Sequence, residues 1–369
     1  MSSDLDFDFA IVGAGIAGST LAARLAAQGR VLLLEREAQP GLHSTGRSAA
    51  MFMESYGPPQ ARALTRASRA EIGPEVLSPR GVLYEAWQGQ ESLLAGQFAA
   101  LQASGSAVQH IDASAALARV PALQPLGLVG AIVEADAMDI DVHALHQQAL
   151  RRARALGATL WTDAELQAAQ QEPGGWTLAV SGGRGVRTRV LANAAGAWAD
   201  TVAQRAGLAP LGLQPRRRSA FSFEAPGHDH RGWPAVVAVD EGWYFKPDAG
   251  QLLGSPANAD PVPAHDVVAE EIDIATGIAR IEERTTLVIR RPRRTWAGLR
   301  TFAPDGELVI GADPRAAGFF WLAGQGGYGI QSAAGAALLA EALLLGMPMP
   351  PALQIQGVQP ERMSPARLI

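Results

Sequence analysis

The chain of 369 residues contains no cysteine. Disulfide bonds, thiolate metal ligands and a cysteinyl link to a cofactor are therefore excluded. Charged residues make up only 18% of the chain, and the formal net charge is −5. This balance gives no general reason to bind nucleic acid or an anionic membrane, so we expect neither partner.

Long apolar runs are also missing. The run 333–345 is too short to cross a membrane and is interrupted by Gly335 and Glu341. The N-terminus is acidic and lacks the basic region of a signal peptide, so we expect a cytoplasmic protein without a transmembrane segment. The chain is rich in glycine, with 40 residues, and 48% of it is hydrophobic. This composition suits close-packed helices on sheets, in one large domain or two interleaved ones.

The clearest motif lies at the start of the chain. Residues 7–12 have the pattern of a buried strand, the glycine-rich turn 13–18 follows at once, and residues 19–28 have the pattern of a helix. A second apolar strand at 31–34 ends on Glu35. This order of strand, glycine turn, helix, strand and acid predicts a Rossmann-type dinucleotide site.

Each part of this motif has a physical role. Gly13 permits the tight turn, Gly15 lets a pyrophosphate approach the backbone, and Gly18 lets the helix pack closely on the strand. The helix N-terminus offers N–H groups and a positive dipole end to the phosphates. Glu35, seventeen residues after Gly18, can bind a ribose diol and disfavours a 2′-phosphate. FAD or NAD is therefore favoured over NADP.

Three further stretches are suited to close contact between backbone and ligand. Residues 43–50 combine small and hydrogen-bonding side chains, and residues 191–198 form a strand that runs into small residues and then a helix. The glycine-rich turn 324–331 precedes the last long helix, so its N–H groups form another candidate site for an anion or an oxygen acceptor.

The remaining pattern alternates between helices and short strands. We expect helices at 58–72, 90–104, 141–156, 268–283 and 331–345, and a loop at 51–57. We expect strands at 81–84, 127–133, 176–180, 186–191, 216–223, 235–240, 242–246, 251–255, 295–302, 307–310 and 319–323. The Rossmann-type segments lie at the start, middle and end of the chain, with antiparallel segments between them. The predicted fold class is α/β, with two discontinuous domains.

The whole chain resembles the FAD-dependent D-amino-acid oxidase and glycine oxidase family. The resemblance rests on the N-terminal glycine turn with Glu35, on Asn-Ala-Ala-Gly-Ala-Trp (193–198) and on Gly-Gly-Tyr-Gly-Ile-Gln (326–331). Within the family it is greatest to the bacterial D-arginine dehydrogenases. That likeness rests on the longer strings at 36–41, 43–50, 211–215, 246–250, 254–261 and 295–300.

The resemblance implies a glutathione-reductase-like FAD-binding domain at 1–80, 136–212 and 301–369, and an antiparallel substrate domain at 81–135 and 213–300. It implies non-covalent FAD and hydride transfer from the α-carbon of a D-amino acid to flavin N5. The imino acid formed is then hydrolysed to a 2-oxo acid and ammonia, and oxygen or a quinone reoxidises the flavin. The implied cofactor-binding residues are Gly13, Gly15, Ile16, Ala17, Gly18, Glu35, Arg36, Ser44, Thr45, Arg47, Ser48, Ala49, Ala195, Gly196, Trp198, Gly326, Gly327, Tyr328, Gly329, Ile330 and Gln331.

Five residues are implied in substrate binding. Arg218 and Arg300 lie on short predicted strands and are the candidate carboxylate anchors, because a guanidinium fits a carboxylate bidentately. Tyr244 matches a tyrosine that hydrogen-bonds the substrate carboxylate. Tyr56 resembles a lid tyrosine that closes over the flavin and excludes water. The carbonyl of Gly327 is the candidate acceptor for the substrate amine.

The side-chain pocket departs from the arginine-specific relatives. They carry an acid soon after Ser-Pro-Arg to hold the guanidinium, whereas Val82 takes that place here; Glu85 could substitute only with a different strand register. Met51 and Met53 replace polar residues of the lid. A buried guanidinium without a partner is costly. We therefore expect a preference for apolar or uncharged D-amino acids.

Other polar residues have simpler interpretations. His143 and His146 are three apart on a predicted helix, and His228 and His230 lie in a turn, but neither pair has an evident third ligand. We interpret all four, and the arginines at 216–217, as solvated surface residues and expect no metal.

Two other functions stay open. An FAD oxidase of 2-hydroxy acids or N-methyl amines would keep the same carboxylate anchors. A non-catalytic dinucleotide-binding protein would bind nucleotide that substrate never reduces. No convincing general base is evident, and the sequence leaves open whether the chain is a monomer or a dimer.

Overall fold

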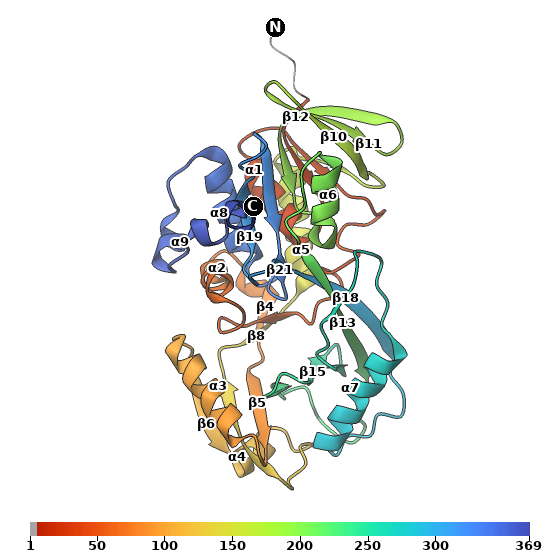
Figure 1. Cartoon of the computed structure of the whole chain (residues 1–369). Coiled ribbons are helices and arrows are strands. Elements are labelled where there is room, and N and C mark those ends of the chain that lie inside the picture. The colour runs from red at the N-terminus through yellow and green to blue at the C-terminus, as the bar shows by residue number, and fades with distance from the viewer. Residues whose placement is uncertain (1–5) are drawn as a thin grey trace.

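The structure is a computed structural model that describes residues 6–369. The start of the chain, on which the expected lack of a signal peptide depends, lies mostly outside the described residues. Figure 1 shows an elongated molecule with two halves, each built on its own large sheet, and a narrower waist between them. A three-stranded sheet of β3 (Met51–Phe52), β8 (Met138–Ile140) and β4 (Leu77–Pro79) accompanies the two large sheets.

The first large sheet contains the dinucleotide motif. Its parallel part has the order β9 (Thr159–Trp161), β2 (Val31–Leu34), β1 (Phe7–Val12), β12 (Arg184–Asn193) and β20 (Phe319–Ala323). Three further strands pair antiparallel: β10 (Leu166–Glu172), β11 (Gly175–Val180) and β19 (Val309–Ala312). All-buried apolar strands such as β2 are expected where helices cover both faces of a parallel sheet.

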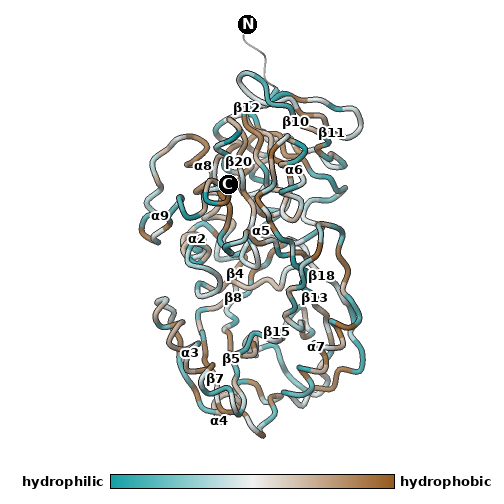
Figure 2. Tube along the Cα trace, in the orientation of Figure 1, coloured by the Kyte–Doolittle hydropathy of each residue, from teal (hydrophilic) through white to brown (hydrophobic). Residues whose placement is uncertain are grey.

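Helices cover both faces of this sheet. On one side the core contains residues of α1 (Ile16–Leu25), α5 (Val142–Ala155) and α8 (Ala333–Leu345), together with α2 (Pro59–Arg69) and α9 (Pro351–Ile355). The core of the other side includes α6 (Ala199–Arg205) and the β10–β11 hairpin. Hydrophobic segments of the trace gather in this interior around β20 (Figure 2).

The second large sheet has ten strands and is antiparallel except where β14 pairs with β5. Its order is β21 (Gln325–Gly326), β18 (Arg294–Phe302), β13 (Gln214–Phe223), β16 (Gln251–Ser255), β15 (Tyr244–Asp248), β14 (Ala235–Ala238), β5 (Val82–Trp87), β7 (Leu128–Glu134) and β6 (Val108–Asp112), with β17 (Asp260–Pro261) beside β13. Its helices are α3 (Glu91–Ala103), α4 (Ala113–Arg119) and α7 (Glu271–Arg284). Within residues 6–369 there are also four single turns of 3-10 helix, at Pro74–Val76, Gly196–Trp198, Pro360–Arg362 and Pro365–Leu368.

The strand register divides the second sheet into two chemically different faces. Phe221, Phe245 and Leu83 share the face whose core includes α4 and α7. Arg218 and Tyr244 fall on the opposite face, because side chains alternate along each strand. That second face borders the pocket described below.

The α/β fold class is confirmed, but some element boundaries differ from those predicted. Helix α1 begins at Ile16, three residues before the predicted start, so Gly18 lies inside its first turn. The predicted loop at 51–57 begins with strand β3, which pairs with β8. Strand β10 was not predicted, because Leu-Gln-Ala-Ala-Gln-Gln-Glu lacks both β-branched residues and apolar alternation.

Candidate functional site

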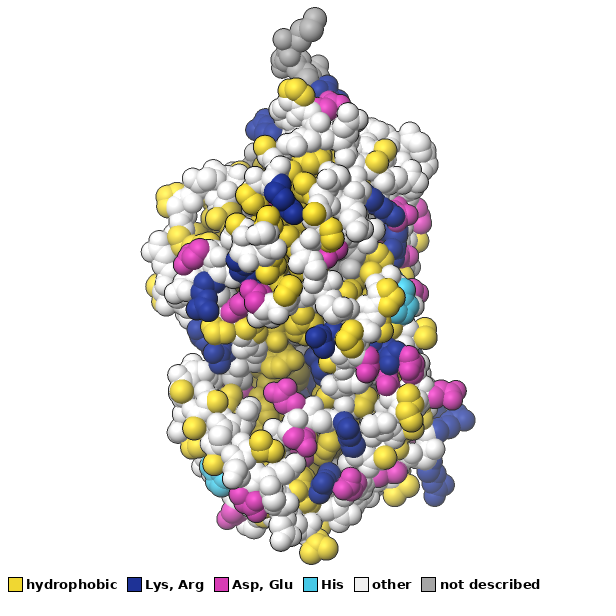
Figure 3. All heavy atoms as spheres, in the orientation of Figure 1, with side chains coloured by type: hydrophobic (Ala, Val, Ile, Leu, Met, Phe, Trp, Pro, Cys, Tyr) yellow, Lys and Arg dark blue, Asp and Glu magenta, His cyan; other side chains and the backbone are white. Residues whose placement is uncertain are grey.

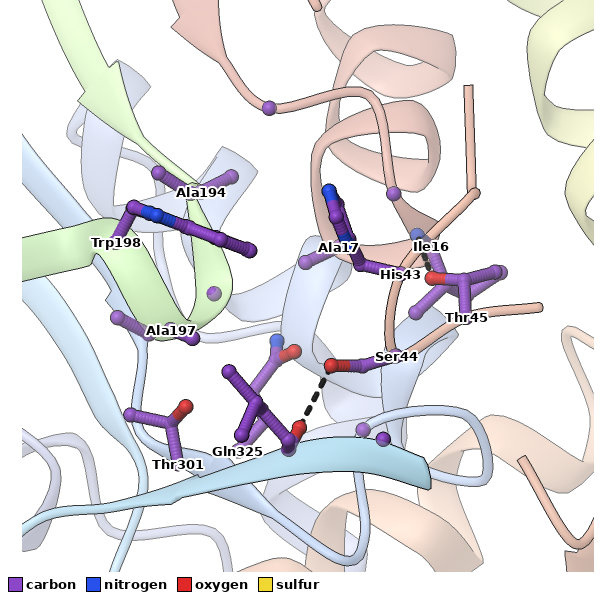
Figure 4. Close-up of a pocket in the computed structure, with 18 of the residues that line it drawn as sticks. Ile16, Ala17, His43, Ser44, Thr45, Ala194, Ala197, Trp198, Thr301 and Gln325 are labelled. Carbon is purple, nitrogen blue, oxygen red and sulfur yellow. Dashed lines mark hydrogen bonds between the residues drawn. The ribbon is translucent and has the colours of Figure 1, made fainter. Parts of the chain in front are cut away.

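One continuous pocket extends from the glycine turn of the first sheet to the polar face of the second sheet. Most of the predicted site residues line it: Gly13, Gly15, Ile16, Ala17, Glu35, Arg36, Ser44, Thr45, Arg47, Ser48, Ala49, Ala195, Gly196, Trp198, Arg218, Tyr244, Arg300, Gly326, Gly327, Gly329 and Ile330. Four do not: Gly18, Tyr56, Tyr328 and Gln331. Figure 4 shows the middle of the pocket, with Trp198 and Ala194 on one side and His43 and Ile16 on the other.

The glycine turn is held by backbone contacts that exclude side chains. Gly13 has φ +100°, and a Cβ there would lie 2.5 Å from the carbonyl oxygen of Ala194. A Cβ on Gly18 would lie 1.9 Å from the carbonyl oxygen of Gly13. Gly18 therefore serves the packing of α1 on the turn, while Gly13 and Gly15 border the pocket.

Glu35 is fixed at the end of β2 with its carboxylate at the pocket. One oxygen accepts the Ala14 N–H at 3.0 Å, and the other accepts the Glu37 N–H at 3.0 Å. The side chain is buried. A carboxylate oxygen has two lone-pair directions, so both oxygens retain capacity to accept hydrogen bonds from a ribose diol.

The start of α1 is already partly capped by protein. The hydroxyl of Thr45 accepts the Ile16 N–H at 3.0 Å (Figure 4). On the far side of the turn, His146 donates from Nε2 to the carbonyl oxygen of Ala14 at 2.8 Å. His146 is therefore not a solvated surface residue as predicted: it is buried, and its burial lowers the pKa of the imidazole. A neutral Nε2–H tautomer satisfies this carbonyl, which can only accept.

Arg36, His43 and Trp198 form a group of packed side chains that lines the pocket. The guanidinium of Arg36 lies 4.3 Å from the ring centroid of Trp198, and the ring of His43 lies 4.7 Å from the same indole. Glu37 binds both Arg36 and His43. The prediction of cofactor-binding residues omitted His43. Its position directly before the hydrogen-bonding residues 44–45 was the available signal.

The segment 44–48 is tied to β18 and to the loop before α7. Ser44 Oγ donates to the carbonyl oxygen of Leu299 at 2.6 Å. The Arg47 side chain donates to the carbonyl oxygens of Val267 at 2.8 Å and Ala297 at 3.1 Å, and pairs with Asp266 at 2.6 Å. The guanidinium of Arg47 thus joins the two halves of the molecule.

Two arginines and a tyrosine meet where the pocket reaches the second sheet. Arg218 and Arg300 come from neighbouring strands, in which Arg218 pairs with Gly298 and Arg216 with Arg300. Arg218 and Tyr244 lie on the same face of this sheet, and both line the pocket. No ion pair to Arg218 or Arg300 occurs among residues 6–369, and the buried Nε of Arg218 has no hydrogen-bond partner. Within the described part of the chain, this is a cationic site without a protein counter-ion.

The electrostatics of this site favour an anion. Burial and the neighbouring Arg300 lower the pKa of Arg218. Burial acts to raise the pKa of Tyr244, but Arg300 and Arg218 outweigh it and lower that pKa below its usual value. Uncompensated positive charge in a buried pocket is relieved by a bound carboxylate, and an arginine can hold a carboxylate bidentately.

The turn 325–332 places Gly327 against this cationic site. A Cβ at Gly327 would lie 3.0 Å from the hydroxyl of Tyr56 and 3.1 Å from Nη1 of Arg300. That Nη1 donates to the Tyr56 hydroxyl at 3.3 Å, and the Tyr56 ring packs edge-on against Tyr328 with centroids 5.0 Å apart. Tyr328 therefore packs on Tyr56, and neither residue is among those that line the pocket, although Tyr56 contacts Arg300, which does.

Gln331 contacts the loop that carries Tyr56. Its carboxamide accepts the Met53 N–H at 3.2 Å and donates to the carbonyl oxygens of Met53 at 3.1 Å and Tyr56 at 3.2 Å. It also donates to the hydroxyl of Thr65 at 3.0 Å. The Gln331 side chain is thus buried and used in fixing the loop. The prediction that backbone N–H groups of this turn face a flavin stays a prediction.

Next to Tyr244 on the same face of the second sheet lies a mainly apolar cluster, outside the set of residues that line the pocket. Val237 and Tyr84 lie opposite Tyr244 on the next two strands, and they pack with Met51 and Met53 in one cluster. Figure 3 shows a hollow at the waist of the molecule with hydrophobic side chains at its base. Glu85 does not replace the missing acid, because it lies on the other face of β5, with Leu83.

Two other polar residues differ from the solvated surface predicted for them. Arg217 is buried and pairs with Asp260, Glu270 and Asp273. His230 is buried beside Trp233. No group of three or more metal-ligating side chains is arranged to hold an ion within residues 6–369. In the same range, no helix is both long and apolar enough to cross a membrane.

Comparison with known proteins gives one family. The sequence profile described as "FAD dependent oxidoreductase" matches residues 8–342. Glycine oxidase from Geobacillus kaustophilus is similar in structure, with 23% identity, a TM-score of 0.80, and coverage of 94% of this chain and 96% of that one. L-proline dehydrogenase from P. horikoshii has 19% identity, a TM-score of 0.82, and coverage of 98% and 97%. The L-α-glycerophosphate oxidase from Mycoplasma pneumoniae, with FAD bound, has 17% identity, a TM-score of 0.83, and coverage of 92% and 94%.

Proposed function

The chain belongs to the family of FAD-dependent oxidoreductases, and on this premise we propose that it oxidises an α-amino acid. The finer proposal is a D-amino acid with an apolar or uncharged side chain. The observation that carries the proposal is the pair Arg218 and Arg300, which share a pocket with Tyr244 and have no protein counter-ion among the described residues.

The residues present fit FAD, the cofactor of this family. The side-chain-free turn around Gly13 suits a pyrophosphate, and Glu35 is fixed where it can accept from a ribose diol. The stacked Arg36 and Trp198 offer a flat surface to the nucleotide end. Towards the other end, the buried Nε2 of Gln325 lacks a partner and lines the same pocket, so it is free to donate to a cofactor oxygen.

When bound, FAD supplies the two-electron acceptor that takes hydride from the substrate carbon. In this proposal, Arg218, Arg300 and Tyr244 bind the substrate carboxylate and fix the position of the adjacent carbon. The carbonyl of Gly327 accepts from the substrate amine. Tyr56, over Arg300, covers the carboxylate and excludes water.

The proton balance needs no dedicated base. A substrate that binds with a neutral amine gives up a hydride from its α-carbon and becomes a protonated imino acid. Water then hydrolyses this product to a 2-oxo acid and ammonium. The titratable groups around the arginines are Tyr56, Tyr244 and Tyr328, and two cations oppose binding of a protonated amine. We therefore expect turnover to rise with pH as the free amine forms.

Two observations support the finer substrate. The resemblance of strings such as 43–50 and 295–300 to D-arginine dehydrogenases favours the D configuration. Val82, Val237, Met51 and Met53 form an apolar cluster on the same face of the sheet as Tyr244. The acid opposite Val82 on this face, Glu134, already accepts from Ser55 and Tyr84. Among the similar structures are a glycine oxidase and an L-proline dehydrogenase. Both names are consistent with oxidation of an amino acid, but the two named substrates differ.

The test is an anaerobic titration of the purified flavoprotein with matched D and L pairs of leucine, methionine, arginine and alanine. We expect D-leucine and D-methionine to bleach the flavin band, and their L forms to leave it unchanged. Bleaching by D-arginine but not by D-leucine would refute the apolar preference. Bleaching only by 2-hydroxy acids or N-methyl amines would replace the proposed reaction with the second candidate function.

A further inference from the structure

The loop that carries Tyr56 is attached to the second sheet through a buried carboxylate. Ser55 donates from Oγ to Oε2 of Glu134 at 2.7 Å, and the Tyr84 hydroxyl donates to the same oxygen at 3.2 Å. All three side chains are buried. Glu134 closes β7 and lies directly opposite Val82, so it belongs to the face of the sheet that carries the apolar cluster.

The loop is fixed on its other side by the first half of the molecule. Gln331, just before α8, binds the backbone of Met53 and Tyr56. Tyr56 therefore lies between an attachment to Gln331 and, through the preceding residue, an attachment to Glu134. Its hydroxyl is held on Nη1 of Arg300, against Gly327.

A hydrogen bond from a hydroxyl to a buried carboxyl oxygen resists loop opening more than an exposed one does, because an opened loop leaves Oε2 with fewer donors in an apolar surrounding. Met53, Val82 and Ile132 belong to the same buried apolar cluster as Tyr84, which donates to Glu134. Burial raises the pKa of Glu134, and the hydrogen bonds from Ser55 and Tyr84 oppose that rise. Both protonation states keep an oxygen that accepts from Ser55.

We propose that Glu134 is a positioning residue for the reaction: by accepting from Ser55 it holds the Tyr56 hydroxyl on Arg300 over the substrate carboxylate. The inference rests on the proposed function, because it assigns a carboxylate to Arg300. The inference also means that the 51–57 loop is held in one position by these hydrogen bonds. Its opening requires the Ser55–Glu134 contact to break.

The test uses the FAD-loaded enzyme and a double-mutant cycle with Tyr56→Phe. The probe is 4-methylpentanoate, which is leucine without its amino group, and its dissociation constant is read from the change in flavin absorbance. Ser55→Ala and Glu134→Leu are each expected to weaken binding about tenfold. Glu134→Gln keeps an acceptor oxygen and a similar size, so it is expected to stay within about twofold of wild type.

The cycle separates positioning from general stability. In the Tyr56→Phe background, Ser55→Ala is expected to change the affinity less than about twofold, because the group it positions is gone. An unchanged affinity in Ser55→Ala, or the same tenfold loss with and without the Tyr56 hydroxyl, would overturn the proposal. If Glu134→Leu does not fold, Ser55→Ala alone tests the proposal, since this variant leaves the buried acid in place.

A measurement without ligand keeps this inference distinct from the proposed function. Amide hydrogen exchange of the FAD-loaded enzyme is expected to rise in residues 51–57 on Ser55→Ala and to stay unchanged in the β10–β11 hairpin. If wild type fails to bind the acid but the loop still loosens, the proposed function fails while the attachment stands. If wild type binds the acid and the loop does not loosen, only the role of Glu134 fails.

Discussion

Glu85 offers a sharp test of how the second sheet is packed. Its carboxyl group is fully buried on the α4–α7 side of β5, and neither oxygen has a hydrogen-bond partner. Burial raises its pKa from 4.5 to about 8, although the positive charge of Arg284 partly opposes this. The change to make is Glu85→Gln, which keeps the shape of the side chain and removes its ionisation.

The sign of the effect follows from proton binding. Between pH 4.5 and about 8 the folded chain holds a proton on Glu85 that the unfolded chain has lost, so stability falls as pH rises through this window. A pKa difference of one is worth about 1.36 kcal/mol, so the full loss above pH 8 is about 5 kcal/mol. For a cooperatively melting chain of this length, that is about 6 °C in melting temperature.

The assay is thermal melting of the FAD-saturated protein from pH 5 to pH 9. We expect wild type and Glu85→Gln to melt within about 1 °C of each other at pH 5, and the variant to melt about 6 °C higher at pH 9. The exposed Glu361→Gln is the matched control and is expected to follow wild type throughout. If the melting temperatures of Glu85→Gln and wild type changed with pH by the same amount, the burial of an ionisable, unpartnered carboxyl group would be refuted.

Three further changes test the pocket. Arg300→Lys cannot bind a carboxylate bidentately, so kcat/KM for the best amino acid should fall about 30-fold, the equivalent of about 2 kcal/mol, mainly through KM; an unchanged KM would contradict the clamp. Gly13→Ala forces a Cβ to within 2.5 Å of the Ala194 carbonyl at φ +100°, so the affinity of apoprotein for added FAD, read by flavin fluorescence, should fall at least tenfold. Val82→Glu places a second acid directly opposite Glu134, so the free energy of unfolding, measured in urea, should fall by about 2–4 kcal/mol. An unchanged free energy of unfolding would show that the two carboxyl groups do not share a face.

The start of the fold and the pocket could be predicted from sequence because their signals are local. Strand, turn, helix and acid follow within 35 residues, and the glycines are required by backbone contacts formed inside that unit or with the next strand. Arg218 and Arg300 were proposed as anchors because each lies on a short predicted strand and because the family resemblance implies a carboxylate clamp. That the two arginines share a pocket follows from the pairing of their strands, and this pairing could not be predicted from the sequence.

The residues wrongly interpreted as solvated depend on distant partners. The acceptor for His146 is Ala14, 132 positions away. The residues next to Arg217 in the sequence do not predict its ion pairs with Asp260, Glu270 and Asp273. The burial of a polar side chain is thus difficult to predict from sequence, because it depends on hydrogen-bond and ion-pair partners that are distant along the chain.

Several predictions stay predictions. These are the domain boundaries at 80, 135, 212 and 300, the cofactor role of each pocket residue, the cytoplasmic location and the choice of oxygen or quinone. The lid interpretation of Tyr56 is now more specific: its loop is fastened by Gln331 and Ser55.

The most direct test of the central claim is whether the pocket selects a carboxylate beside the flavin. We would titrate the FAD-loaded enzyme with 4-methylpentanoate and with 4-methylpentanamide, which has the same shape without the charge, and follow the flavin absorbance. Arg218, Arg300 and Tyr244 predict that the acid binds and perturbs the flavin, with the amide at least about 100-fold weaker, equivalent to about 2.7 kcal/mol. Equal affinities, or binding of the acid that leaves the flavin spectrum unchanged, would contradict the account.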